Sequence, residues 1–292
     1  MNPEEQKLAG GLYFVATPIG NARDITLRAL DVLAAADVLA AEDTRSLRKL
    51  MEIHGISVGD RPLLAYHDHN GGKMRPRLLA EIAAGKSVAY ASEAGTPLIS
   101  DPGFDLSRAA AEEGLPVRSL PGASAVLAAL TMAGLPTDRF LFAGFLPNAK
   151  GQRKSALKAL AGVQATLVFY ESPRRTAAML ADAAEMLGAD RPAAMCRELT
   201  KKFEECRRGT LGELAENLAA GPIKGEVVVV IGRGEIKAIS ESVMTEMLED
   251  ALKRMSVRDA ADVVAEGTGA PRRQVYQMAL KLGLVNEQGD DG

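Results

Sequence analysis

The chain has 292 residues, 47% of them hydrophobic, and a formal net charge of −3. This length exceeds that of a typical single domain, so we expect two domains and a small appendage. The N-terminal residues lack the basic start and apolar core of a secretory signal, and the longest strongly apolar run, at 227–231, is too short to cross a bilayer. The only cysteines, Cys196 and Cys206, favour neither a disulfide scaffold nor a zinc site. These features predict a soluble cytoplasmic protein without a membrane partner.

The first half of the chain alternates short β-branched or aromatic runs with helix-length segments, as in βα units around a parallel sheet. The predicted strands are residues 12–17, 37–41, 63–66, 87–91 and 116–120. We expect Asp24 to cap the first helix, and we expect further helices near 44–54, 73–84, 104–113 and 123–133. The pattern predicts an N-terminal α/β domain over residues 11–136.

A second α/β domain is predicted over residues 137–235. Its expected strands are residues 140–145, 166–171, 193–199, 203–210 and 226–231, with helices near 152–161, 174–187 and 211–220. The third and fourth of these strands are separated by only a few residues, which predicts an antiparallel hairpin in a mixed sheet.

The C-terminal segment, residues 243–285, predicts a small helix-turn-helix-like appendage. Ser256 and Asp259 have the spacing of a capping box, Pro271 suits the first turn of the next helix, and Gly283 is expected to end it. Six Lys or Arg residues against three acids over 253–281 make this part locally basic, as a contact with a phosphate backbone requires. Two interpretations stay open: the helices bind RNA, or they only pack on the second domain or on a dimer partner.

Polar or glycine-rich loops follow each predicted strand of the first domain, at residues 17–21, 41–45, 66–70, 92–103 and 120–125. The carboxyl ends of parallel strands share one edge of a sheet, so these loops predict one large site. Gly95 and Pro97 can turn the backbone so that main-chain groups face a ligand. The sequence contains neither G-x-G-x-x-G after a strand nor a P-loop, which weakens dinucleotide and nucleoside triphosphate interpretations.

Titratable side chains in these loops allow several roles. His67 and His69 lack a third nitrogen or sulfur ligand nearby, so we expect no metal and favour a loop hydrogen bond or a phosphate contact. The acidic pairs Glu42 with Asp43 and Glu93 with Asp101 are able to orient a hydroxyl or accept a proton, and they are equally able to cap the helices that follow.

A series of motifs in one order spans roughly residues 11–285: LYFVATPIGN, AEDTR, HDHN, SEAGTPLISDPG, PGASA, AGLPTDRF, GFLP, FYESPRR, RELTKKFEE and KGEVVVVI. This combination resembles the tetrapyrrole-methylase-like (class III) methyltransferases and, among them, the bacterial ribosomal RNA small subunit methyltransferase I family. The resemblance implies two α/β domains with S-adenosylmethionine in the cleft between them, and a homodimer. It also implies 2′-O-methylation of a cytidine ribose in the decoding region of 16S rRNA within the small ribosomal subunit.

Carried over motif by motif, the resemblance implies a set of residues that contact the cofactor: Pro18, Glu93, Gly95, Thr96, Leu98, Ile99, Ser124, Ala125, Tyr170, Leu199, Glu226 and Val228. The chain departs from the family pattern at Glu93, where Asp is usual, at Ala123, where Pro is frequent, and at Arg174, where His is common. Arginine at position 174 argues against an obligatory base there and favours a phosphate contact.

For the reaction itself, Glu42, Asp43 or Glu171 is expected to orient the acceptor hydroxyl. The residues expected to contact RNA are Asn21, Arg23, Arg45, His67, Lys154, Arg174, Arg175, Arg272 and Arg273. Two alternatives stand beside this hypothesis: a C-methyltransferase of a tetrapyrrole precursor, which uses the same fold, and a non-catalytic ribosome-associated protein in which Glu93 blocks the cofactor. Basic clusters and the appended helices favour RNA over a macrocycle.

Overall fold

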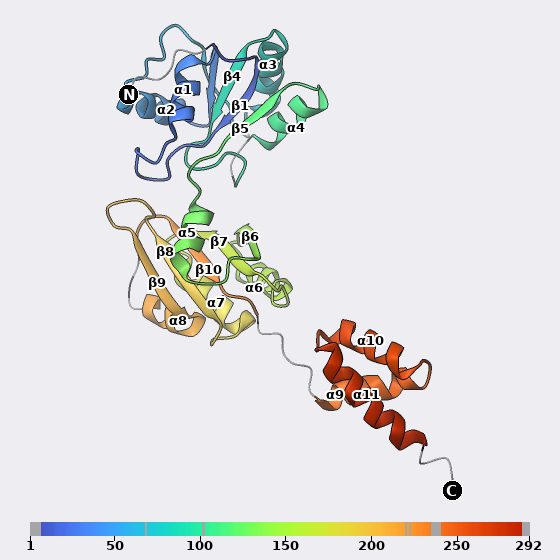
Figure 1. Cartoon of the computed structure of the whole chain (residues 1–292). Coiled ribbons are helices and arrows are strands. Elements are labelled where there is room, and N and C mark those ends of the chain that lie inside the picture. Colours follow the sequence, from blue (N-terminus) through green and yellow to red (C-terminus); the bar gives the residue numbers. More distant parts are fainter. Residues whose placement is uncertain are drawn as a thin grey trace. The chain divides into compact units, whose positions relative to one another are not determined.

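The structure is a computed structural model that describes residues 7–67, 69–100, 103–219, 221, 223–234 and 241–287. The chain divides into two compact units, residues 1–233 and 234–292. The first unit contains two lobes, each built on its own sheet (Figure 1). Among the described helices, none has the length and apolar character needed to cross a bilayer.

The first lobe is built on a sheet with strand order β3-β2-β4-β1-β5. Its strands are β1 (Gly11–Val15), β2 (Val38–Ala41), β3 (Leu63–Ala65), β4 (Ser87–Ala91) and β5 (Val117–Leu120). All four pairings are parallel, and Val15 lies opposite Ala91 on one side and Leu120 on the other. The predicted strands are therefore confirmed to within two residues, and their carboxyl ends share one edge.

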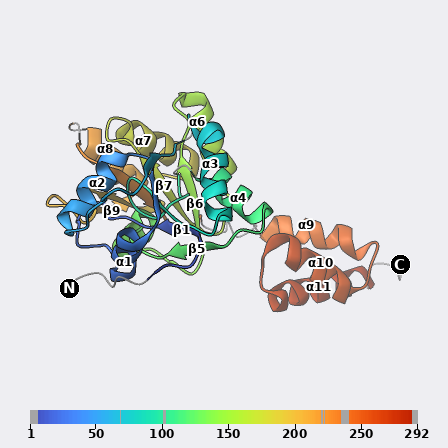
Figure 2. The ribbon, with the colours of Figure 1, turned by 90° about the horizontal axis from the view of Figure 1, so that it is seen from above.

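Helices cover both faces of this sheet (Figure 2). Helices α1 (Leu27–Ala35) and α2 (Thr44–Ile53) pack on one face, and α3 (Gly71–Ala83) and α4 (Phe104–Glu112) pack on the other. The prediction that Asp24 caps α1 is wrong. Residues 21–24 form a turn in which the Asp24 amide donates to the Asn21 carbonyl, and the cap is Thr26, whose side chain accepts the Ala29 amide.

The second lobe contains a mixed sheet with strand order β6-β7-β10-β8-β9. Its strands are β6 (Phe140–Phe145), β7 (Thr166–Glu171), β8 (Pro192–Arg197), β9 (Glu205–Thr210) and β10 (Val227–Ile231). β6 and β7 are parallel, β10 is antiparallel to both of its neighbours, and β8 and β9 form the predicted antiparallel hairpin.

Alternating side chains of this sheet face two helical layers. Helices α6 (Lys150–Ala159), α7 (Thr176–Leu187) and α8 (Leu211–Ala219) pack on the face that carries Phe169 and Val229. Helix α5 (Ala125–Ala133) packs on the opposite face, against Val168 and Val230 (Figure 1). The predicted boundary at residue 136 lies after α5, whereas the packing of α5 on the second sheet divides the lobes before Ala125.

The C-terminal unit contains α9 (Glu241–Leu252), α10 (Val257–Thr268) and α11 (Arg272–Glu287) in its described residues. Ser256 is confirmed as the N-cap residue of α10, because its Oγ accepts the Asp259 amide at 3.2 Å. The second half of the predicted capping box differs: Asp259 Oδ2 accepts from Ser256 Oγ, at 2.7 Å, rather than from the Ser256 backbone amide. Two expectations need correction: α9 adds a helix before the predicted pair, and α11 continues past Gly283. A glycine inside a helix costs only about 1 kcal/mol, which packing readily offsets.

Candidate functional site

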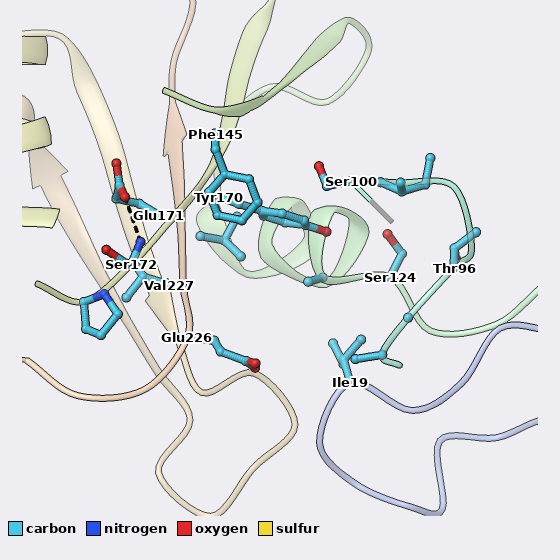
Figure 3. Close-up of a pocket in the computed structure, with 16 residues that line it drawn as sticks. Ile19, Thr96, Ser100, Ser124, Phe145, Tyr170, Glu171, Ser172, Glu226 and Val227 are labelled. Atoms are coloured by element: carbon cyan, nitrogen blue, oxygen red, sulfur yellow. Dashed lines mark hydrogen bonds between the residues drawn. The ribbon is translucent and has the colours of Figure 1, made fainter. Parts of the chain in front are cut away.

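A cavity of about 380 Å³, here the first cavity, lies between the strand-end loops of the first lobe and the second lobe (Figure 3). The first lobe and α5 contribute Ile19, Ala94, Gly95, Thr96, Ile99, Ser100, Ser124 and Ala125. The second lobe contributes Phe145, Tyr170, Glu171, Ser172, Pro173, Glu226, Val227 and Val228. The lining is largely apolar with a few polar groups, as is usual for small-molecule sites.

Hydrogen bonds tie the loops after β1, β4 and β5 together at the first cavity. The backbones of Thr17 and Gly95 exchange two hydrogen bonds of 3.0 Å, and Ser92 Oγ donates to the Gly95 carbonyl at 2.6 Å. Thr96 Oγ1 donates to the Ala123 carbonyl at 3.0 Å. Gly95 has φ of +82°, a conformation that other residues rarely adopt. The wall of the cavity is therefore a fixed backbone surface.

The N-terminus of α5 opens into this cavity. Ser124 is the N-cap residue, yet its side chain makes no capping hydrogen bond, and both Ser124 and Ala125 line the cavity. The first backbone amides of a helix have no partner within the helix and carry the positive end of its dipole. This end of the cavity consequently suits an anionic group.

Aromatic rings form the opposite wall. Tyr170 makes edge-to-face contacts with Phe142 and Phe145, at centroid distances of 4.8 and 5.6 Å. Figure 3 shows Phe145 and Tyr170 on one side of the cavity and Thr96 and Ser124 on the other. Apolar and aromatic surface of this kind suits a planar heterocycle.

A second cavity, of about 300 Å³, adjoins the first. The two share Ile19, Ala94 and Glu226 in their linings. The rest of the second cavity comes from the loop after β1, from α2, from the start of the loop after β4 and from the β8–β9 hairpin: Thr17, Pro18, Gly20, Ala22, Ser46, Leu47, Lys49, Leu50, Ile53, Ser92, Glu93 and Lys201.

The residues expected to contact the cofactor divide among three places. The first cavity brings most of them together: Gly95, Thr96, Ile99, Ser124, Ala125, Tyr170, Glu226 and Val228. Pro18 and Glu93 line the second cavity instead. Leu98 and Leu199 pack into apolar clusters of the first and second lobes. Among the described residues, those of the loops after β2 and β3 line neither cavity, so only three of the five expected loops, those after β1, β4 and β5, form cavity walls.

Asp43 and Glu171, both expected to orient the hydroxyl, have partners within the protein. Asp43 caps α2, accepting the Arg45 amide at 2.8 Å and pairing with its guanidinium at 2.9 Å. Hydrogen bonds from the Arg45 side chain and backbone lower the pKa of Asp43 to about 2. Glu171 has a buried carboxylate that accepts the Ser172 amide at 2.8 Å and lies 3.2 Å from Arg175 (Figure 3). Glu42 is half-buried and lines neither cavity.

Several residues expected to contact RNA have partners within the protein. Lys154 pairs with Glu185 at 2.5 Å, and Arg272 pairs with Asp262. Arg175 donates to the carbonyls of Leu146 and Pro147 as well as pairing with Glu171. These guanidinium and ammonium groups brace the fold, so their geometry gives no separate support for a contact with RNA.

The remaining expected RNA contacts are more accessible. Arg23, Arg174 and Arg273 are exposed, and Arg45 is exposed although paired with Asp43. The backbone amide of Asn21 donates to Thr200 Oγ1 at 3.1 Å, and this contact places the loop after β1 on the β8–β9 hairpin. His67 is half-buried and lines neither cavity. Among the described residues, no group of three or more His, Cys, Asp or Glu could hold a metal ion.

Several residues that line the cavities were not predicted from the sequence: Phe145, Ser100 and Lys201 are examples. Phe145 and Lys201 belong to the motifs GFLP and RELTKKFEE, so the signal was present as part of a motif. Their directions toward the cavities depend on backbone turns that no sequence pattern specifies.

The comparisons with known proteins agree with this architecture. Residues 11–215 match the family described as Tetrapyrrole (Corrin/Porphyrin) Methylases, and residues 238–283 match the RsmI C-terminal HTH domain. Among solved structures, Thermus thermophilus uroporphyrin-III C-methyl transferase complexed with S-adenyl homocysteine has 21% identity and a TM-score of 0.54, over 76% of this chain and 97% of that one. A diphthine synthase has 19% identity and a TM-score of 0.58, over 76% and 89%. Fold and site define a class III S-adenosylmethionine-dependent methyltransferase.

More similar relatives give the particular family. Proteins named Ribosomal RNA small subunit methyltransferase I share 50% identity over 286 residues in Mesorhizobium japonicum, covering 98% of this chain and 96% of that protein. The protein of that name from Pseudomonas aeruginosa shares 42% identity over 278 residues, covering 94% and 98%. The chain therefore belongs to the ribosomal RNA small subunit methyltransferase I family.

The first cavity fits the cofactor of this enzyme class. Its volume lies within the range of about 300–1,000 Å³ that is usual for small-ligand sites. Three features of the cavity match parts of the cofactor: the uncapped N-terminus of α5 suits its amino-acid carboxylate, and the aromatic wall suits its purine. The Glu226 carboxylate suits its ribose hydroxyls. A Cβ at position 95 would lie 3.2 Å from Ile19 Cγ2, so glycine keeps this wall open.

Proposed function

We propose that the chain methylates the 2′-hydroxyl of a cytidine ribose in the decoding region of 16S rRNA, with the small ribosomal subunit as substrate. It acts in the cytoplasm as a homodimer. The observation that carries this proposal is the junction of the first cavity with a second cavity whose lining includes Lys49 and Lys201. The names of the relatives at 42–50% identity support RNA rather than a tetrapyrrole as the acceptor.

Residues of both lobes would hold the donor. The first amides of α5, after Ser124, would bind its carboxylate, and Tyr170 with Phe145 would pack against its purine. Glu226 would accept hydrogen bonds from its ribose hydroxyls. Bound S-adenosylmethionine would supply an electrophilic methyl group on a sulfonium. The 2′-oxygen would bond to this methyl carbon as the carbon–sulfur bond breaks, S-adenosylhomocysteine would leave, and the hydroxyl proton would pass to solvent, so that no strongly basic partner is needed.

Positioning then becomes the main task of the protein. Holding two partners in a reactive geometry can supply about 7–11 kcal/mol of barrier reduction. Asp43 and Glu171 already pair with Arg45 and Arg175, so the proposal does not depend on either carboxylate as a base. The rate enhancement in this proposal therefore depends on the rigid loops around Gly95 and on a firm hold of the RNA.

Phosphate contacts would give that hold. Arg23, Arg45 and Arg174 are exposed cations of the first unit, and Arg273 is an exposed cation of the C-terminal unit. The chain has 4% aromatic residues and no Trp, which argues against a stacking platform for single strands. The match of residues 238–283 to a helix-turn-helix family supports an RNA-binding role for the C-terminal unit.

Methyl transfer to isolated small subunits tests the proposal. Subunits from cells that lack this methylation are incubated with methyl-labelled S-adenosylmethionine, and nuclease mapping locates the labelled ribose. We expect label on a 2′-oxygen of one cytidine of 16S rRNA. Deletion of residues 243–292 should weaken subunit binding and reduce its salt dependence. Label on a base, on a protein or on a tetrapyrrole alone would refute the proposed function.

A further inference from the structure

The turn that joins β8 to β9 adopts an unusual backbone. Glu198 and Thr200 have φ of +51° and +64°, a left-handed conformation that is strained in residues other than glycine. Contacts with a neighbouring segment maintain it. The Glu198 amide donates to the Glu226 carbonyl at 3.0 Å, and the Glu226 amide donates to Glu198 Oε1 at 3.1 Å. Backbone strain held in place by surrounding contacts is a common feature of functional sites.

Gly225 makes room for this arrangement. A Cβ there would lie 2.4 Å from the side-chain atoms of Glu198, and Gly225 itself has φ of +90°. Two segments far apart in the sequence are therefore shaped to place the Glu198 carboxylate beside the β8–β9 turn.

The strained turn positions one cation. Lys201 Nζ lies 3.0 Å from Glu198 Oε1 and 2.8 Å from Glu226 Oε2. Desolvation alone would lower the pKa of Lys201, but hydrogen bonds to Glu226 and Glu198 raise it above its ordinary value. Lys201 is thus a charged group at neutral pH. Of its two partners, Glu198 is mostly covered, whereas the side chain of Glu226 is 78% exposed and can exchange with another anion.

The loop after β1 fixes Lys201 from the other lobe. A Cβ on Gly20 would lie 2.5 Å from Lys201 Cγ, so glycine is needed for this close approach. The Asn21 amide donates to Thr200 Oγ1 in the same contact. Lys201 is consequently held at the joint between the lobes, where it lines the second cavity.

The second cavity has the lining of a nucleotide site. Lys49 and Ser46 of α2 line it together with Lys201, and Glu93 and Glu226 add two carboxylates. The ammonium groups suit a phosphodiester, and the carboxylates suit a hydroxyl or amino donor. Because the cavity meets the first one at Ile19, Ala94 and Glu226, a group bound here is adjacent to the donor site.

We propose that the second cavity receives the acceptor nucleotide of the RNA, with Lys201 as the residue that binds its phosphate. This inference rests on the proposed function and adds to it the cavity that holds the acceptor nucleotide and the lysine that binds its phosphate. On binding, a phosphate oxygen replaces the exposed Glu226 carboxylate as a partner of Lys201, while Glu198 keeps the ammonium group in position.

The first experiment fills the second cavity. Ser46→Phe puts an aromatic ring into it from α2, and Glu52→Phe puts the same ring on an exposed position of that helix outside either cavity. Calorimetry with S-adenosylmethionine and methylation of unmethylated small subunits are measured for both. We expect donor affinity within about twofold of wild type for both variants, and a loss of kcat/KM of at least about 100-fold for Ser46→Phe only.

The second experiment removes the cation. Lys201→Gln is compared with Lys202→Gln, a change of the adjacent lysine. The ammonium group of Lys202 lies 5.5 Å from the centroid of the Phe203 ring, and Lys202 does not line the second cavity. We expect Lys201→Gln to raise the KM for small subunits about tenfold at saturating donor, with kcat changed less than about threefold. Lys201→Arg should restore most of the loss, because arginine also binds phosphate. Lys202→Gln should behave as wild type.

The outcomes separate this inference from the proposed function. If the wild-type enzyme labels 16S rRNA and Ser46→Phe labels it equally well, the second cavity does not hold the acceptor. A parallel loss of donor affinity in Ser46→Phe would also overturn the inference, since the cavity would then belong to the donor site. If the wild-type enzyme labels no RNA at all, the proposed function fails and this inference fails with it.

Discussion

Gly95→Ala tests whether the backbone turn after β4 forms the donor site. Gly95 has φ of +82°, and an L-residue in the left-handed region is strained by about 1–2 kcal/mol. The added Cβ would also lie 3.2 Å from Ile19 Cγ2, closer than ordinary van der Waals contact. The backbone hydrogen bonds to Thr17 hold the turn in place, so relief of the strain must move the wall of the first cavity. We expect S-adenosylmethionine to bind about 5–30-fold more weakly, the equivalent of that strain.

Calorimetry at 25 °C measures the affinity, and urea unfolding measures the stability of the same variant. Gly55→Ala is the matched control, because Gly55 has φ of +69° and no atom within 4 Å of the position of a Cβ. It should lower the free energy of unfolding by about 1 kcal/mol and leave donor affinity unchanged. Unaltered donor affinity in Gly95→Ala, or an equal loss in both variants, would refute the reasoning.

Three further predictions concern single groups. Asp43→Asn keeps a capping oxygen and should retain methylation within about threefold at pH 7, whereas a loss of kcat of about 100-fold would identify Asp43 as the base. Because the folded pKa of Asp43 is about 2, its contribution to stability is present above about pH 4. In acid unfolding, that contribution should be lost as the pH falls toward 2. Burial raises the pKa of the Cys196 thiol, so mass spectrometry should find Cys196 of the native protein unmodified after treatment with iodoacetamide. The stability of the wild type should also fall, relative to that of Cys196→Ala, as the pH rises above the range in which an ordinary thiol loses its proton. Arg153→Met leaves the buried Asp182 carboxylate without its partner and should lower the free energy of unfolding in urea by about 3–5 kcal/mol, and Arg153→Met combined with Asp182→Leu should recover more than half of that loss.

Most strands of the fold could be predicted because buried strands read as apolar runs. The run at 227–231 becomes β10, which lies inside the second sheet with all five residues buried, and residues 87–91 become β4 without a change of boundary. The sequence also placed the loops correctly at one sheet edge, since parallel order follows from alternating strands and helices. The packing partner of α5 was not predictable in the same way, because helical periodicity shows an apolar surface without showing which sheet covers it.

The candidate site was predictable where a motif specifies backbone shape. The turn at Gly95 and the α5 N-terminus at Ser124 both line the first cavity, whereas their contact with the cofactor stays a prediction. The roles of the acids were less accessible, because they depend on partners: Arg45 makes Asp43 a cap and Arg175 engages Glu171. The position of Lys201 was not predictable, because it depends on a left-handed turn that tertiary contacts rather than local sequence maintain.

The C-terminal unit has a core of its own, formed by Met244, Leu248, Ala261, Val264, Val275 and Ala279. Because its core is formed by its own residues, such a unit can be added to or lost from a protein by gene recombination.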